Sequence, residues 1–293
     1  MAFPKETIEP QMFKIDWKVN PVLRAVEESV GNFVVRRGEY GWLGDDRMDE
    51  IAAFVKDKDI SIDQSLSLRS AILQQKSVKT FGRLQGNAHK IRKLYDAGQG
   101  VVELSKKFDY PPMNTFRAIL SARGWSKTRI KETLRDPKKK FGKRDLEQFN
   151  AAESSDRVAN VDQGDTQLRA DLFEDILGDF FEAKGVSIRR QPEMVKEQYK
   201  EHGRPVRTPD LLLLDHVVIN GQQVAWIDAK HFYGADVDFQ RRKTIKQMNR
   251  YIEEWGQGAI VFRHGFCANL RVPAVLLLDA SQLDLSRMKN NPN

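Results

Sequence analysis

The sequence predicts an all-α N-terminal region followed by a C-terminal α/β domain with a central mixed sheet flanked by helices. Three observations support this fold class. Between Arg47 and Arg123, apolar residues recur at the i, i+3, i+4 spacing of amphipathic helices. From Gly164 onward, short aliphatic runs alternate with longer amphipathic stretches, as in strands separated by helices. Asn220-Gly221 lies between two apolar runs and is the dipeptide preferred in two-residue hairpin turns.

The composition is typical of a globular protein. Hydrophobic residues make up 40% of the 293 residues and charged residues 30%, which is enough apolar material for a core. No apolar run approaches the ~20 residues of a membrane helix, and Met1 to Asp16 lacks the features of a secretory or organellar leader. Cys267 is the only cysteine, which excludes intramolecular disulfides and Cys-based zinc sites. We therefore expect an intracellular protein with no membrane partner.

The net charge of +7 is distributed unevenly along the chain. Lys76 to Arg144 contains 19 basic and 5 acidic residues, whereas Asp145 to Glu182 contains 2 basic and 11 acidic residues. A dense basic segment attracts polyanions through counterion release. This segment favours nucleic acid as a partner; the alternative is a solvated basic surface.

Residues 1–45 mix apolar patches with Gly and Pro and predict no defined element. Residues 46–136 form the predicted all-α region, which begins with a helix around Ile51. Three helices follow: one ends at Gly98, the second, a short one, covers 101–108, and the third covers 113–123 after the Pro111-Pro112 break. Short helices joined by a tight turn indicate a helix-turn-helix module that binds nucleic acid, or a helical hairpin that only packs.

The third helix is predicted to turn Phe116, Ile119 and Leu120 inward and to expose polar side chains suited to phosphates and base edges. Residues 137–163 form a predicted basic and polar linker, whose run of lysines resembles a nuclear-import signal or a phosphate-contacting loop. The nucleus is thus the expected compartment in a eukaryotic cell, with the cytoplasm as the alternative. The candidate nucleic-acid contacts are Lys106, Lys107, Asn114, Thr115, Arg117, Ser121, Arg123, Lys138, Lys139 and Lys140.

Residues 164–285 form the predicted α/β domain, and residues 286–293 a disordered tail. The helix predicted from about Gln167 to Lys184 carries a broad apolar stripe. The remaining expected elements are a strand starting at 186, a charged loop over 191–207, an apolar run over 211–214, a strand over 224–230, a helix over 238–255, and strands over 259–262 and 274–278.

Three charged residues in this domain form the candidate active site: Asp210, Asp228 and Lys230. Asp228 and Lys230 share one face of their strand because side chains alternate with a period of two. A strict hairpin at Asn220-Gly221 would place Asp210 opposite His231, on the other face, so a shared site requires a one-residue bulge, expected near residues 215–216. The alternative is that Lys230 is only the salt-bridge partner of a buried Asp228.

These elements resemble the PD-(D/E)XK nuclease superfamily, which implies a restriction-endonuclease-like fold. From about Lys90 to Leu278 the chain is more closely similar to the family of the human codanin-interacting nuclease, the TPD-motif proteins, although that relative has Glu in place of Asp228. The matching features are Leu134-Arg135-Asp136-Pro137, Thr208-Pro209-Asp210, Trp226-Ile227-Asp228-Ala229-Lys230, Gln247, and the stretch from Gly256 to Val261. Gln247 with Tyr251 also resembles the Gln-X-X-X-Tyr element of RecB-like members of the superfamily.

The resemblance implies a role for each matching residue. Asp210 and Asp228, with the carbonyl of Ala229, would bind Mg²⁺ or Mn²⁺, and Glu174 on the preceding helix would add a carboxylate through water; Asp171 and Asp175 are the alternatives to Glu174. Lys230 would orient the attacking water or stabilise developing charge. The remaining pair, Gln247 and Tyr251, lies one helical turn apart and would orient the site, contact phosphate or only pack.

The expected function is therefore that of a metal-dependent nuclease that hydrolyses phosphodiester bonds, with DNA favoured over RNA as the substrate. The alternative is a DNA-binding or adaptor protein with a vestigial nuclease fold that binds a protein partner. The resemblance suggests a partner of the codanin type.

Overall fold

The computed structural model describes residues 11–158, 163–204 and 207–289, which belong to two compact units. We call residues 1–27 with 164–293 the sheet unit, and residues 28–163 the helical unit. The mixed α/β class is confirmed, since the sheet unit contains a central sheet flanked by helices. No described helix combines the length and apolarity needed to cross a bilayer.

The sheet unit contains a six-stranded mixed sheet, in which β1, β3, β4, β5 and β6 are neighbours in that order and β2 also pairs with β3. Strands β4, β5 and β6 are parallel, whereas β3 is antiparallel to β4. The strands are β1 (Met12–Ile15), β2 (Ile188–Arg190), β3 (Leu211–Ile219), β4 (Gln222–Lys230), β5 (Gly258–Phe262) and β6 (Val275–Asp279); the helices are α9 (Gln163–Ala183), α10 (Gln191–His202), α11 (Asp238–Trp255), a 3-10 turn (Ala280–Gln282) and α12 (Ser286–Lys289).

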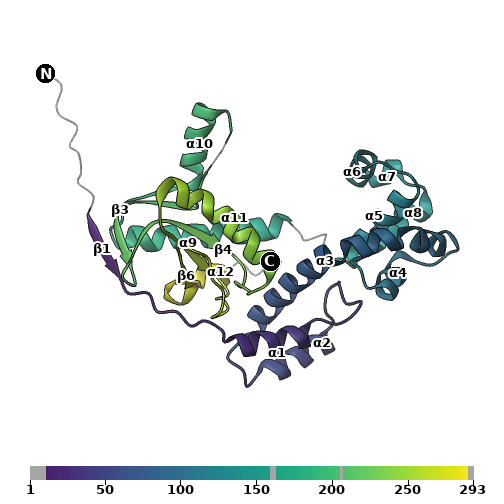
Figure 1. Cartoon of the computed structure of the whole chain (residues 1–293), viewed down its shortest axis with the longest axis horizontal. Helices are drawn as coiled ribbons and strands as arrows, with labels where there is room; N and C mark the ends of the chain where they lie inside the picture. The colour runs from purple at the N-terminus through teal and green to yellow at the C-terminus, as the bar shows by residue number, and fades with distance from the viewer. Residues whose placement is uncertain (1–10, 159–162, 205–206, 290–293) are drawn as a thin grey trace. The chain divides into compact units, whose positions relative to one another are not determined.

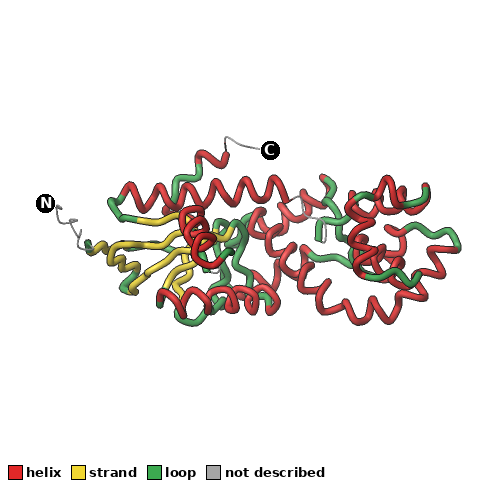
Figure 2. The backbone as a smooth tube through the Cα atoms, turned by 90° about the horizontal axis from the view of Figure 1, so that it is seen from above, coloured by secondary structure: helices red, strands yellow, loops and turns green. Residues whose placement is uncertain are grey.

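The strands of the sheet unit lie between helices on both faces (Figures 1 and 2). The apolar stripe of α9, which includes Phe173, Leu177 and Phe181, is buried in one core with Ile227 and Val261 of the sheet. On α11, Met248 and Tyr251 are buried, and the Tyr251 ring packs edge-on against Trp226 of β4, with 5.3 Å between ring centroids. The predicted helices at 167–184 and 238–255 are thus confirmed as the layers on the sheet.

The β3–β4 hairpin turns at Asn220-Gly221 as predicted, and both residues have positive φ (49° and 78°). Near the turn the register is that of a strict hairpin, with Val217 opposite Val224. Beyond it, Leu212 lies opposite Trp226, so β3 contains three more residues than β4 between the two pairs. The expected one-residue bulge is therefore wrong in size. A shift of three residues is also an odd number, so it moves the side chain of Asp210 to the other face of the sheet just as a one-residue bulge would.

The irregular stretch of β3 lies where two strands meet on its outer edge. β1 pairs with β3 from His216 onward, and β2 pairs with it up to Leu213. Between them, the Asp215 carboxylate accepts hydrogen bonds from the backbone N–H of Gln11 at 2.9 Å and of Ser187 at 2.7 Å. Asp215 thus links the starts of two segments far apart in the sequence, which fixes the extra residues in place.

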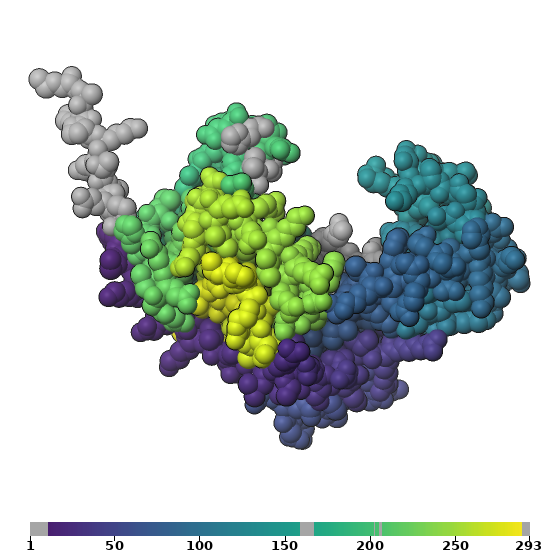
Figure 3. All heavy atoms as spheres, in the orientation of Figure 1, coloured from purple at the N-terminus to yellow at the C-terminus, as the bar shows by residue number. Residues whose placement is uncertain are grey.

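Several sequence predictions for the sheet unit need correction. The charged loop expected over 191–207 contains α10, which starts with Pro192 in its first turn and buries Met194. Figure 3 shows α10 standing out from the body of its unit. The tail expected to be disordered from 286 begins with α12, whose Met288 lies in the core; residues 290–293 lie outside the described residues. Within the unassigned segment 1–45, β1 and Trp17 belong to the sheet unit and its core.

In the helical unit, residues between Leu84 and Ala152 form one large aromatic and aliphatic core. The predicted helix ends at Gly98 and at Phe108 are confirmed, and Phe116, Ile119 and Leu120 are fully buried as expected. Its helices are α1 (Arg24–Val34, which begins in the sheet unit), α2 (Asp45–Val55), α3 (Ile62–Asp96), α4 (Val101–Phe108), α5 (Pro112–Ala122), α6 (Lys127–Arg135), α7 (Pro137–Lys140) and α8 (Lys143–Ser154).

The predicted linker at 137–163 is also corrected, because its described part is folded. Residues 137–158 contain α7 and α8, and Phe141, Phe149 and Ala152 lie in the core of the helical unit. The Phe116 ring of α5 packs against the rings of Phe141 and Phe149, with 5.5 and 6.1 Å between ring centroids. The polar composition of this stretch thus reflects the outer face of two helices. Residues 159–162 lie outside the described residues.

Candidate active site

The two candidate carboxylates are buried on neighbouring strands. Asp210, immediately before β3, is 8% exposed, and Asp228 on β4 is 1% exposed. Continued by one residue, the register that pairs Leu211 with Ile227 brings Asp210 opposite Asp228. Asp210 Oδ2 accepts a 2.6 Å hydrogen bond from the Ala229 N–H, which fixes the carboxylate against β4. The odd register shift therefore brings two acidic side chains to one place on the sheet.

Lys230 and two residues of α11 form a connected polar chain with Asp228. Lys230 Nζ lies 2.5 Å from Asp228 Oδ2 and donates to Gln247 Oε1 at 3.3 Å. Gln247 Nε2 in turn lies 3.3 Å from Asp228 Oδ1 and 3.2 Å from the Tyr251 hydroxyl. The hydroxyl donates to the Thr208 carbonyl at 3.1 Å. Gln247 therefore holds Lys230 and Asp228 together, and Tyr251 fixes Gln247 to the segment that precedes Asp210.

Glu174 on α9 is electrostatically coupled to this group. Partial burial, with the negative charges of Asp171, Asp228 and Asp175, raises the pKa of Glu174 to about 7, although Lys230 opposes the shift. The two neighbouring acids of α9, Asp171 and Asp175, are exposed, whereas Glu174 is half-buried. Of the three acids considered on this helix, Glu174 is therefore the one directed toward the sheet carboxylates.

Burial and repulsion between the carboxylates raise the pKa of both Asp210 and Glu174. Burial raises the pKa of Asp210 well above its usual range, and the charges of Asp228 and Glu174 add to the shift. Burial would by itself lower the pKa of Lys230, but the charges of Asp228 and Asp210 outweigh it and raise the pKa. One lysine thus lies among three carboxyl groups that disfavour one another's ionisation, and a further cation would favour their charged forms.

The donor set fits a hard divalent cation, which takes oxygen ligands. Apart from the Lys230 ammonium, Asp228 Oδ2 has no hydrogen-bond donor among the described residues, although it is fully buried. In the part of the chain that the structure describes, no three His, Cys, Asp or Glu side chains are close enough together to enclose a metal. Asp210 and Asp228 are the oxygen donors that lie at the site, with Glu174 beyond them.

Gln191 is a site residue that the sequence did not indicate. It is the first residue of α10, and its Nε2 lies 3.3 Å from Asp210 Oδ1 and 3.2 Å from the Thr208 carbonyl. Its backbone N–H donates to the Asp210 carbonyl at 2.9 Å. The only local signal was Pro192, which favours a helix start, and no pattern linked that start to residue 210.

Basic side chains gather at the ends of β4 and β5, beside Lys230. His231 contacts the Arg263 guanidinium, and its ring lies 5.9 Å from that of His264. Burial lowers the pKa of His231 to about 3, with contributions from Arg263, His264 and Arg169. His231 is therefore uncharged at neutral pH.

The predicted nucleic-acid contacts of the helical unit are only partly accessible. Thr115 is fully buried and donates to the Pro111 carbonyl, so its assignment as a contact is wrong. Asn114 is half-buried against Ser77, and Arg123 is paired with Asp96 and Asp145. The exposed members of the set are Lys106, Lys107, Arg117, Ser121, Lys138, Lys139 and Lys140, with Lys139 paired to Asp136.

Residues 140–281 match the sequence model of a family described as a protein of unknown function with a TPD sequence motif. The matched span contains Thr208-Pro209-Asp210 and the whole polar group described above. The chain is also 29% identical over 149 residues to an uncharacterised protein of Acanthamoeba polyphaga mimivirus. That match covers 47% of this chain and 52% of the viral protein, so the chain spans about half the length of this curated relative. No solved structure matches the chain.

Proposed function

We propose that the sheet unit is a divalent-metal-dependent nuclease of the PD-(D/E)XK type with a restriction-endonuclease-like fold. The observation that carries the proposal is the three-residue register shift, which brings Asp210 to the face of Asp228 and Lys230. A strand hairpin without this irregularity would separate the two acids. The order of helix, hairpin, lysine-bearing strand and helix also follows the pattern that this superfamily shares.

Asp210 and Asp228 would hold Mg²⁺ or Mn²⁺, with Glu174 acting through water. A cation bound there would supply charge that polarises the scissile phosphate and makes water a stronger nucleophile. Lys230 orients the water and stabilises the charge that develops on the phosphate oxygens. Gln247 keeps the lysine beside Asp228, and Tyr251 restricts Gln247 to that position.

DNA is the favoured substrate, and RNA is the alternative. The basic residues of the helical unit supply the sequence-independent attraction to phosphates. The exposed run Lys138–Lys140 fits either a phosphate contact or a nuclear-import signal, so nuclear localisation stays a prediction.

A cleavage panel tests the proposal, with single-stranded, duplex, flap and four-way DNA and matched RNA, in Mg²⁺, in Mn²⁺ and in chelator. Asp228→Asn removes charge from the metal site with little change in size, and Lys230→Ala removes the group that acts on water and phosphate. Each should lower cleavage about 100-fold or more while nucleic-acid binding persists. Asp63→Asn, an exposed acid at the start of α3, is the matched control and should cleave as the wild type does.

Two outcomes would refute the proposal. Cleavage that survives both site substitutions would assign the activity to another site. A wild-type chain that cleaves no substrate in either metal, yet binds a protein partner tightly, would favour the adaptor with a vestigial nuclease fold.

A further inference from the structure

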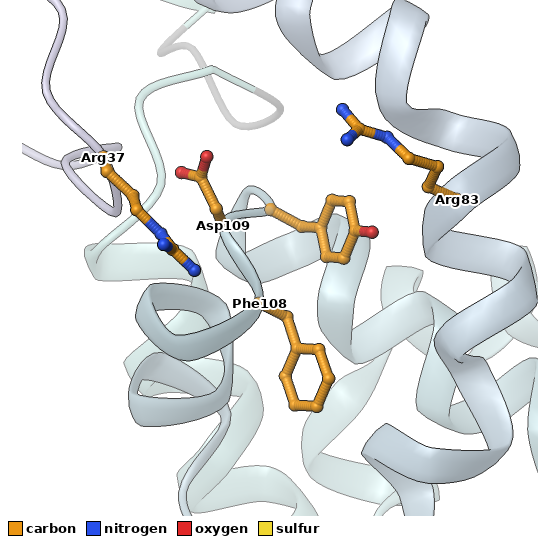
Figure 4. A pocket seen from close by; sticks show the side chains of 5 residues that line it. Arg37, Arg83, Phe108 and Asp109 are labelled. Atoms are coloured by element: carbon orange, nitrogen blue, oxygen red, sulfur yellow. The ribbon is translucent and has the colours of Figure 1, made fainter.

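The helical unit contains a cavity of about 300 Å³ that is separate from the carboxylate site. It is lined by Arg37, Arg83, Phe108, Asp109 and Tyr110. Arg37 and Arg83 approach it from opposite sides, and the Phe108 ring lies to one side of the two guanidinium groups (Figure 4). Its size is at the lower end of the range of small-ligand pockets, large enough for one nucleotide but not for a duplex.

The cavity has a net positive lining. Both arginines are exposed, and no described acid forms an ion pair with Arg83. The one acid of the lining, Asp109, is neutralised by Lys76, whose Nζ lies 2.8 Å from both of its oxygens. Partial burial opposes ionisation of Asp109, but hydrogen bonds from Lys76, the Gly38 N–H and the Tyr40 hydroxyl outweigh it and lower the pKa. Two guanidinium groups thus remain to attract an anion.

Phe108 gives the cavity an aromatic surface within this basic surround. It is half-buried at the end of α4, and the Lys90 ammonium lies 5.8 Å from its ring centroid, near the outer limit of a cation–π contact. Lys106 and Lys107, both exposed, precede it, and Arg37 donates to the Lys107 carbonyl at 3.1 Å. Such a combination of aromatic ring and cations is the arrangement that binds unpaired nucleotides.

The helix predicted to read base edges is poorly placed to do so. Seven residues of α5 are buried, Thr115 among them, because α3, α4 and α8 pack around it. Arg117 and Ser121 are its exposed polar residues. The cations and the aromatic ring of the cavity are therefore more accessible to a nucleic-acid strand than the mostly buried α5 is.

We propose that this cavity binds one unpaired nucleotide of a nucleic-acid strand, with the phosphodiester backbone between Arg37 and Arg83 and the base against Phe108. A base inside a duplex is stacked on its neighbours and cannot lie on the ring, so the cavity selects substrates with a single-stranded segment. The inference rests on the proposal that the chain acts on nucleic acid, and the substrate class is nucleic acid with a single-stranded segment.

Fluorescence anisotropy with the full chain tests the inference, using a short labelled DNA single strand, the matched blunt duplex and the matched RNA strand. Phe108→Leu keeps an apolar side chain but removes the stacking face, and should raise the Kd for the single strand about fivefold or more. Arg83→Ala should reduce the slope of log Kd against log salt by about 0.7, the value for one phosphate contact on a single strand. Duplex binding should change little in either variant.

Two further variants sharpen the comparison. Lys56→Ala removes one exposed positive charge just after α2, outside the cavity lining, and should bind the single strand as the wild type does. Arg117→Ala tests α5 directly. Thermal melting separates lost binding from lost folding for Phe108→Leu, and Arg83, being exposed, can be changed without disturbing the core.

Unchanged single-strand binding in both Phe108→Leu and Arg83→Ala would overturn the inference, as would a loss confined to Arg117→Ala. Weaker binding of both the DNA and the RNA single strand in Phe108→Leu and Arg83→Ala would support the inference, because both strands carry phosphodiesters and unpaired bases. A chain that binds through the cavity but cleaves nothing would refute the nuclease alone. A chain that cleaves while both cavity variants bind normally would refute the cavity alone.

Discussion

Gly258→Ala should destabilise the sheet unit, because Trp226 occupies the space above Gly258. A methyl group added to Gly258 would lie well inside contact distance of the indole, 2.6 Å from Cε3 and closer still to Cδ2 and Cε2. The indole is fully buried and its Nε1 donates to the Gly256 carbonyl at 2.9 Å, so it cannot move aside freely. Overpacking of this kind costs about 1–3 kcal/mol, which lowers Tm by about 2–12 °C in a unit of this size.

The substitution should also reduce cleavage, because Trp226 supports Tyr251 and through it Gln247. Urea unfolding and the cleavage assay are measured on Gly258→Ala, Trp226→Phe and the double variant. The smaller Phe ring should relieve the clash, giving a favourable coupling energy of about 0.5–3 kcal/mol. A Gly258→Ala protein as stable as the wild type, or a double variant with additive losses, would refute the steric reasoning.

Mg²⁺ at about ten times its Kd should stabilise the chain by about 1.4 kcal/mol and raise Tm by about 3–6 °C in differential scanning fluorimetry, and Asp210→Asn should abolish the shift. Burial raises the pKa of Glu27 above 4.5, so ionisation costs stability as the pH rises through the folded pKa; Glu27→Gln should therefore gain stability over the wild type in urea unfolding at about pH 8, but not below pH 4.5. Gly82→Ala, in the middle of α3 with no atom near the added methyl, should stabilise the chain by about 0.5–1 kcal/mol in the same assay.

The hairpin illustrates what local sequence can and cannot predict. The dipeptide Asn220-Gly221 predicted the position of the turn. A shared site for Asp210 and Asp228, whose burial costs free energy, required a register shift by an odd number of residues between β3 and β4. The size of the shift depends on Asp215, which is held by Gln11 and Ser187, residues 204 and 28 positions away in the chain. The alternation of apolar and polar residues within a strand does not report contacts with such distant residues. The sequence therefore could not distinguish a bulge of three residues from a bulge of one.

The helical unit shows the same limit on a larger scale. The helices themselves were predictable from apolar spacing and from breaks such as Pro111-Pro112. The faces of α5 that are buried depend on its contact with α8. The polar composition of residues 137–163 predicted a linker instead of this helix. The sequence pattern therefore predicts an exposed Thr115, although its hydroxyl donates to the Pro111 carbonyl inside the core. Likewise, the charge-rich stretch after residue 191 concealed α10 and the contact of Gln191 with Asp210.

The balance of charge at the carboxylate site argues against a purely structural salt bridge. If Lys230 served only to neutralise Asp228, the pair would be complete and Asp210 would add an uncompensated cost, because burial and repulsion both raise its pKa. An apolar residue at position 210 would then be favoured. Instead the fold uses a three-residue irregularity, an N–H from Ala229 and an amide from Gln191 to hold the second acid in place. The cation that we propose for this site would offset that cost, whereas Lys230 alone leaves Asp210 without a counter-charge of its own.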